Sequence, residues 1–199
     1  MPAGAIALPQ RREILAVLGP LTAKLVVMPE AAWPRLTAAC DANESLPAPL
    51  VHAASVAAVS VIATLVGAIL IPGITVGLVI VHVLGAVGAY VGAAVISVTL
   101  APRFVRAPAT TEHLVGRFAS AAVLPLVACG ALNVIPIPVL SFVWALFGAA
   151  LSAWSGFVGA SALLGMEGTR RRDAAALIAA LGIAPIVVAT LLRVVLATP

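Results

Sequence analysis

The stretch SLPAPLVHAASVAAVSVIATLVGAILIPGITVGLVIVHVLGAVGAYVGAAVISVTLAP, residues 45–102, contains no aspartate, glutamate, lysine or arginine. A hydrocarbon core about 30 Å thick is crossed by about 20 apolar residues in a helix, so this stretch is long enough for two spans and a turn. A second uncharged stretch, residues 118–166, has room for two more spans, and a third, residues 174–192, has room for one. We therefore predict an all-α polytopic integral membrane protein with five transmembrane helices.

The composition favours the same class. Hydrophobic residues make up 63% of the 199 residues and charged residues only 9%, whereas soluble domains carry about 25% charge. The formal charge of +4 comes from 11 basic and 7 acidic residues, and the cations flank apolar segments instead of forming one basic face with aromatics. Nucleic acid is therefore not an expected partner, and the lipid bilayer is.

Proline, glycine and asparagine place the turns of the predicted bundle. The breakers at residues 71–73 and 133–138 divide the two long stretches, and Pro136 marks the second of these turns. Asn133 is expected to cap the third helix. Pro125 and Pro185 lie inside spans, where each removes a backbone donor and predicts a kink. The predicted spans of the transmembrane domain, residues 49–199, are about 50–71, 74–100, 114–134, 139–164 and 174–196.

Arginines set the predicted orientation. Arg103 and Arg106 lie between spans two and three, and Arg170, Arg171 and Arg172 fill the loop between spans four and five, whereas the other two turns carry no charge. By the positive-inside rule the charged loops face the cytoplasm, which places the N-terminus inside and the C-terminus outside. The same arginines are candidates for holding anionic lipid headgroups, and the alternative is that they only fix the topology.

Residues 1–48 form a separate cytoplasmic segment in this prediction. Apolar residues between 14 and 26 recur at helical spacing, but they are too few to span, so an amphipathic helix on the membrane surface is expected. A second interfacial helix is predicted near residues 30–40. Pro29 and Glu30 suit its first turn and Trp33 suits the lipid headgroup region. These three residues are candidates for contact with an unidentified protein partner.

Small residues at four-residue spacing predict close contacts between helices. We expect this packing inside the bundle, and contact between chains of a homo-oligomer is the alternative. The candidate positions are Gly73, Gly77, Gly88, Gly92, Gly156 and Gly159.

The sequence offers no visible machinery for catalysis. No aspartate, glutamate or lysine lies inside a predicted span, which argues against a proton-driven pump. There is no carboxylate pair and no serine with a nearby base, so an enzyme is not expected. His52, His82 and His113 lack cysteine or acidic neighbours at ligand spacing, so neither a metal nor another cofactor is expected.

The motif Pro29-Glu30-x-x-Trp33, followed by Arg35-Leu36 and five apolar spans, resembles the Yip1 domain family in its prokaryotic form. Residues 118–127, 132–136 and 156–166 extend the resemblance. It implies a five-span membrane protein whose cytoplasmic N-terminal segment contacts partners, which are Rab GTPases in eukaryotic members. The eukaryotic signature Asp-Leu-Tyr-Gly-Pro is absent from this sequence. A Rab GTPase is therefore not expected as a partner of this chain.

Together these patterns predict a non-catalytic protein of a prokaryotic inner membrane. It would organise the membrane or recruit a partner through its N-terminal segment and basic loops. The alternative is a small transporter or channel-like carrier of an uncharged or lipidic substrate, with the helices kinked at Pro125 and Pro185 as moving parts.

Overall fold

The computed structural model describes residues 23–42, 49–105, 112–134 and 138–197. Two short irregular segments interrupt or extend the helices: a π-helical turn, η1 (Val87–Val91), joins α4 to α5, and a 3₁₀ turn, η2 (Gly130–Val134), continues α6. The helices are α2 (Pro29–Ala42), α3 (Pro49–Ile69), α4 (Val76–Ala86), α5 (Gly92–Phe104), α6 (Glu112–Cys129), α7 (Pro138–Leu164) and α8 (Gly168–Ala197).

Five helical segments are long and apolar enough to cross a membrane. They are α3, the continuous unit of α4, η1 and α5, the unit of α6 and η2, α7, and α8. The protein is thus an all-α polytopic membrane protein, as the uncharged stretches predict. Its turn between α3 and α4 is made possible by Gly73, whose φ of 74° favours glycine. Thr75 caps α4, because its side chain accepts a hydrogen bond from the Leu78 amide.

The fifth helix begins earlier than predicted. Gly165 and Gly168 both have positive φ and reverse the chain after α7, and α8 starts at Gly168. The prediction that Arg170, Arg171 and Arg172 fill a loop is therefore wrong, since they lie in the first turns of α8. The charged residues mark where an apolar span ends, whereas Gly165 and Gly168 mark where α7 ends and α8 begins.

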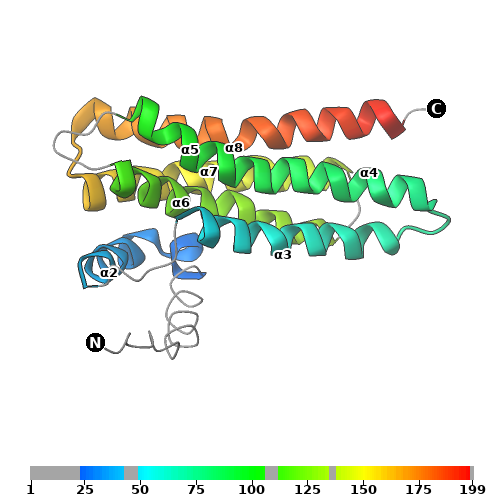
Figure 1. Cartoon of the computed structure of the whole chain (residues 1–199), viewed down its shortest axis with the longest axis horizontal. Coiled ribbons are helices and arrows are strands. Elements are labelled where there is room, and N and C mark those ends of the chain that lie inside the picture. Colours follow the sequence, from blue (N-terminus) through cyan, green and yellow to red (C-terminus); the bar gives the residue numbers. More distant parts are fainter. Residues whose placement is uncertain (1–22, 43–48, 106–111, 135–137, 198–199) are drawn as a thin grey trace, which may run out of the picture.

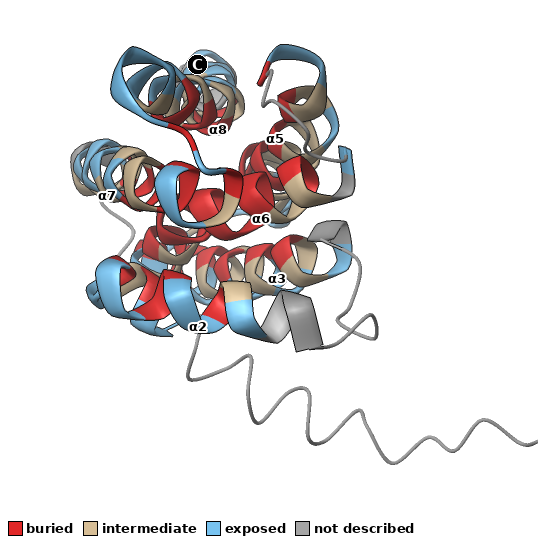
Figure 2. Ribbon diagram, turned by 90° about the vertical axis from the view of Figure 1, so that its left-hand side faces the viewer, coloured by how far each residue is buried: buried red, intermediate tan, exposed pale blue. Residues whose placement is uncertain are grey.

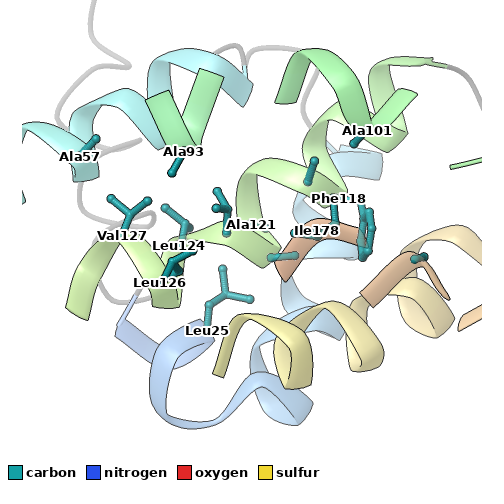
Figure 3. Packing of buried hydrophobic residues seen from close by; sticks show 14 of the residues in the cluster. Leu25, Ala57, Ala93, Ala101, Phe118, Ala121, Leu124, Leu126, Val127 and Ile178 are labelled. Atoms are coloured by element: carbon teal, nitrogen blue, oxygen red, sulfur yellow. The ribbon is translucent and has the colours of Figure 1, made fainter. Parts of the chain in front are cut away.

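Helix α6 lies at the centre of the bundle. In the end-on view of Figure 2 it lies between α3 on one side and α5 and α8 on the other. In the most apolar part of its span 78% of the residues are buried inside the protein, against 28% to 33% in the other four spans. Figure 3 shows its side chains Phe118, Leu124 and Leu126 among those of the surrounding helices. The outer faces of those helices remain apolar, as lipid contact requires.

The two ends of the bundle differ in charge. Helix α2, the end of α5, the start of α6 and the connection from α7 to α8 lie at one end, and the turn from α3 to α4 and the end of α8 lie at the other (Figure 1). Most charged residues of the described ranges belong to segments at the first end, which we call the charged end, whereas Arg193 lies near the end of α8 at the other. Those at the charged end whose side chains the structure describes are Lys24, Glu30, Arg35, Arg103, Glu112, Arg117, Glu167, Arg170, Arg171, Arg172 and Asp173.

Helix α2 runs crosswise to the spans at the charged end. Figure 2 shows it from the side while the spans are seen almost along their axes. Its observed bounds, Pro29–Ala42, agree with the predicted second helix of the N-terminal segment, and Pro29 and Glu30 occupy its first turn. The predicted amphipathic helix over residues 14–26 lies largely outside the described residues.

Candidate functional site at the charged end

Trp33 fixes α2 to the bundle. Its side chain is fully buried, its Nε1 donates a hydrogen bond to Ser155 Oγ at 3.2 Å, and its ring centroid lies 5.9 Å from that of Phe118. Gly159 makes the room, because a Cβ at that position would lie 2.3 Å from Trp33 Cζ2. The sequence predicts that the headgroup region surrounds Trp33, but the side chain is buried against α7, which offers it both a space and a hydrogen-bond acceptor inside the protein.

Helix α2 is amphipathic, with one buried face and one exposed face. Pro29, Ala32, Trp33 and Leu36 are buried and follow the i, i+3, i+4, i+7 spacing of one helix face. Glu30 and Arg35 are exposed on the other face. Of the three predicted partner residues, only Glu30 therefore lies on the surface, while Pro29 and Trp33 dock the helix.

Arg171 is held against α7. Its Nε donates a hydrogen bond to the Phe157 carbonyl at 2.6 Å, and its Cζ lies 3.5 Å from the centroid of the Phe157 ring. Such a cation–π contact favours arginine because its guanidinium is planar. Phe157 in turn stacks on Trp154, with ring centroids 6.2 Å apart and planes at 25°.

The other predicted lipid-binding arginines are more loosely placed. Arg103 is exposed near the end of α5, and Arg170 and Arg172 are exposed on either side of Arg171. Arg106 lies outside the described residues. The structure thus brings Arg103 and the triplet to the same end of the bundle, and of these four described arginines it is Arg171 that lies over an aromatic ring.

A second group of polar side chains is buried inside the bundle. Asn133 Nδ2 donates a hydrogen bond to the Tyr90 hydroxyl, which joins η2 to η1. The prediction that Asn133 caps the third helix is therefore corrected, because its amide pairs across the bundle with the one tyrosine of the chain. Asn133 Oδ1 and Ser97 Oγ are buried without a hydrogen-bond partner among the described residues.

Hydroxyl groups also reach the backbone of α6 around its proline. Pro125 has no N–H, so the helix cannot close its hydrogen bond there. Ser152 Oγ donates to the Ala122 carbonyl at 2.5 Å and Ser60 Oγ to the Val127 carbonyl at 2.5 Å. Helices α6 and α8 continue through Pro125 and Pro185, so kinks at these prolines stay predictions. Pro136 lies outside the described residues.

The structure divides the predicted packing glycines into two groups. Gly92, Gly156 and Gly159 approach other helices: added Cβ atoms would lie 3.4 Å from Pro185 Cβ, 3.3 Å from Ala175 Cα and 2.3 Å from Trp33. No such neighbour lies within 4 Å of Gly73, Gly77 or Gly88, so the prediction of packing inside the bundle is wrong for these three.

Four other glycines also approach neighbouring groups closely and were missed by the spacing rule. An added Cβ would lie 2.4 Å from the Asn133 carbonyl oxygen at Gly67, 2.4 Å from the Tyr90 ring at Gly130, 2.9 Å from Leu126 Cα at Gly148 and 2.6 Å from Leu126 Cδ2 at Gly182. None of the four has another glycine four residues away in the sequence. Spacing between glycines therefore could not identify these positions.

Gly88→Leu tests whether the exposed glycines serve contact between chains. The bundle leaves space at Gly88, so we expect an unfolding free energy equal to that of the parent or higher by up to about 1 kcal/mol, from helix propensity alone. At Gly92, one turn away, a Cβ would already be in contact with Pro185 at 3.4 Å, so the larger side chain of Gly92→Leu should push α8 away and lower the melting temperature in detergent. A smaller particle for Gly88→Leu in size-exclusion chromatography would indicate a homo-oligomer through this face, whereas equal destabilisation by both changes would contradict the described packing.

Comparison with known proteins gives no evidence on the function. No protein-family model matches this chain, and neither a curated protein nor a solved structure matches it. Among the described residues there is no group of three or more histidine, cysteine, aspartate or glutamate side chains that could hold a metal ion. The function is therefore inferred from the geometry at the charged end.

Proposed function

We propose that the protein is a non-catalytic membrane protein that recruits a protein partner through the exposed face of α2 and the neighbouring basic segments. The observation that carries this proposal is the docking of α2 by Trp33, which holds a short amphipathic helix crosswise at the charged end. Because the helix is fixed by its buried face, Glu30 and Arg35 are presented to the solvent in a defined arrangement. A helix that only bound lipid would bury its apolar face in the membrane instead.

The orientation that we propose follows from the charge difference between the two ends. The positive-inside rule places the charged end, with Arg103, Arg170 and Arg172, in the cytoplasm and the end of α8 outside. For a prokaryotic chain this means the inner membrane. The order of a cytoplasmic helical segment and five spans is the organisation of the Yip1 domain family, and membership of that family is part of the proposal.

A carrier of an uncharged or lipidic substrate is the second candidate, and a specific contact favours it. The π-helical turn η1 and the following Gly92 pack against α8, where Gly92 approaches Pro185. A π-helical turn thus meets the proline of α8, and π-helical turns often occur at functional sites. The unpartnered Asn133 Oδ1 lies in the helical turn that contacts η1 through Tyr90. Solute flux into liposomes above the background of protein-free vesicles would favour this candidate.

Site-specific photo-crosslinking in native membranes tests the recruitment proposal. A photoreactive amino acid in place of Arg35 should give a defined protein adduct, and the same residue in place of Val76, which is 77% exposed at the opposite end, is the matched control. We expect at least about fivefold more adduct from the Arg35 position, which corresponds to about 1 kcal/mol of preference. Equal adduct from both positions, or adducts with lipid alone, would contradict the proposal.

A further inference from the structure

Arg171 differs from its neighbours in being fixed before any ligand arrives. A guanidinium carries five N–H donors in one plane. One of them, on Nε, is used by the Phe157 carbonyl, and the Phe157 ring covers one face of the group. The described residues provide no further hydrogen bond to Arg171. Its four remaining donors are therefore held in a defined plane, which suits an anion that accepts two hydrogen bonds.

The surroundings of Arg171 are cationic on balance. Arg170 and Arg172 are exposed beside it, and the acidic residues closest to it in the sequence are Glu167 and Asp173, both exposed. The triplet leaves one net positive charge after those two carboxylates. An open hollow lined by residues 165–170, with the positive-φ turn at Gly165 and Gly168, adjoins the triplet on the α7 side.

The face of α7 below Arg171 is apolar and exposed. Trp154 is 48% exposed and stacks on Phe157, and it lies three residues, about 4.5 Å, farther from the charged end. Phe147, two turns deeper on the same side of the helix, is also exposed. The cation thus stands at the top of an aromatic strip that faces the membrane. An anion with an apolar tail fits this arrangement, whereas inorganic phosphate or an acidic peptide would use only its upper part.

We propose that this corner of α7 and α8 binds one anionic phospholipid. Arg171 binds the phosphate, Arg170 and Arg172 add attraction, and an acyl chain lies along Phe157, Trp154 and Phe147. Anionic lipids are abundant on the cytoplasmic face of membranes, where the charged end is proposed to lie. The site does not require a partner on α2, so it stands or falls separately from the recruitment proposal.

Native mass spectrometry of the full chain, extracted from vesicles of phosphatidylcholine and phosphatidylglycerol in a 4:1 ratio, tests the site. Arg171→Gln should lower the phosphatidylglycerol retained per protein about fivefold, the effect of removing one well-placed cation. The matched control is Arg172→Gln, which removes the same charge without a contact to Phe157; its loss should stay below about twofold. Phe157→Leu keeps all three charges and should also reduce retention, because the guanidinium is no longer held.

Several results would overturn the lipid site. Equal losses for Arg171→Gln and Arg172→Gln would mean diffuse attraction only, and unchanged retention in both would mean no cationic site. Displacement of the lipid by millimolar inorganic phosphate would mean an anion site without lipid specificity. Melting curves of each variant in the same detergent separate lost lipid from lost folding, and Phe157→Leu still tests the site if Arg171→Gln unfolds. Photo-crosslinking from Arg35 would be unaffected by these outcomes.

Discussion

Replacing Trp33 with alanine is expected to release α2 from the bundle. The change removes a fully buried indole, its ring contact with Phe118 and its hydrogen bond to Ser155. Truncation of a buried tryptophan to alanine costs about 3–5 kcal/mol, and a short helix docked mainly through one face has few other contacts to offset that loss. The docked state of α2 should therefore become at least about a hundredfold less populated relative to the undocked state.

Limited trypsin digestion of the detergent-solubilised protein measures this release. Lys24 and Arg35 are exposed, yet cleavage at them requires the backbone to leave its helical conformation. We expect fast cleavage in Trp33→Ala and slow cleavage in the parent. Met28→Ala is the matched control, because Met28 is a large apolar side chain of the same segment that is 61% exposed. Trp33→Phe keeps an aromatic ring but loses the hydrogen bond, which costs about 1 kcal/mol. Its cleavage rate should therefore lie between those of Trp33→Ala and the parent. Equal cleavage rates in all four proteins would show that Trp33 does not hold α2.

The spans could be predicted from the sequence because a membrane allows few alternatives. In lipid each backbone polar group must be paired inside its own segment, so an uncharged stretch of sufficient length has to be helical. Residues 45–102 divide at Pro72 and Gly73, which the structure shows between α3 and α4, and residues 118–166 divide between η2 and α7. The grouping of Arg103 with Arg170 and Arg172 at one end follows from the same rule, since charges are excluded from the core.

The faces by which the helices meet could not be predicted from a single sequence. Tryptophan is typical of the membrane interface, so the sequence predicts that position for Trp33. Its side chain is buried inside the protein because Gly159 leaves space for it and the Ser155 hydroxyl accepts its hydrogen bond. Gly73 and Gly77 satisfy the four-residue spacing, yet that spacing describes one helix and does not indicate whether a second helix lies opposite. The contact of Arg171 with Phe157 joins residues 14 positions apart on two helices, so it depends on the register of α8 against α7.

Gly67→Ala is expected to give the second large effect, a loss of about 3 kcal/mol in the unfolding free energy. An added Cβ would lie 2.4 Å from the Asn133 carbonyl oxygen and 3.1 Å from the Val134 carbonyl carbon. These atoms belong to the backbone of η2 and cannot rotate away as a side chain can, so α3 and η2 would have to separate. Overpacking of this kind costs about 1–3 kcal/mol in a well-packed core, and backbone contact places it at the upper end.

Thermal unfolding in one detergent, with Gly77→Ala as the control, separates the clash from helix propensity. Both changes put alanine in place of a helical glycine, which by itself stabilises a helix by about 1 kcal/mol. Nothing lies within 4 Å of Gly77, so its variant should melt at the same temperature as the parent or higher. The Gly67 variant should melt about 6–12 °C lower. If it melts with the Gly77 variant instead, α3 and η2 lie farther apart than described, and the hydrogen bond between Asn133 and Tyr90 loses the support of that close approach.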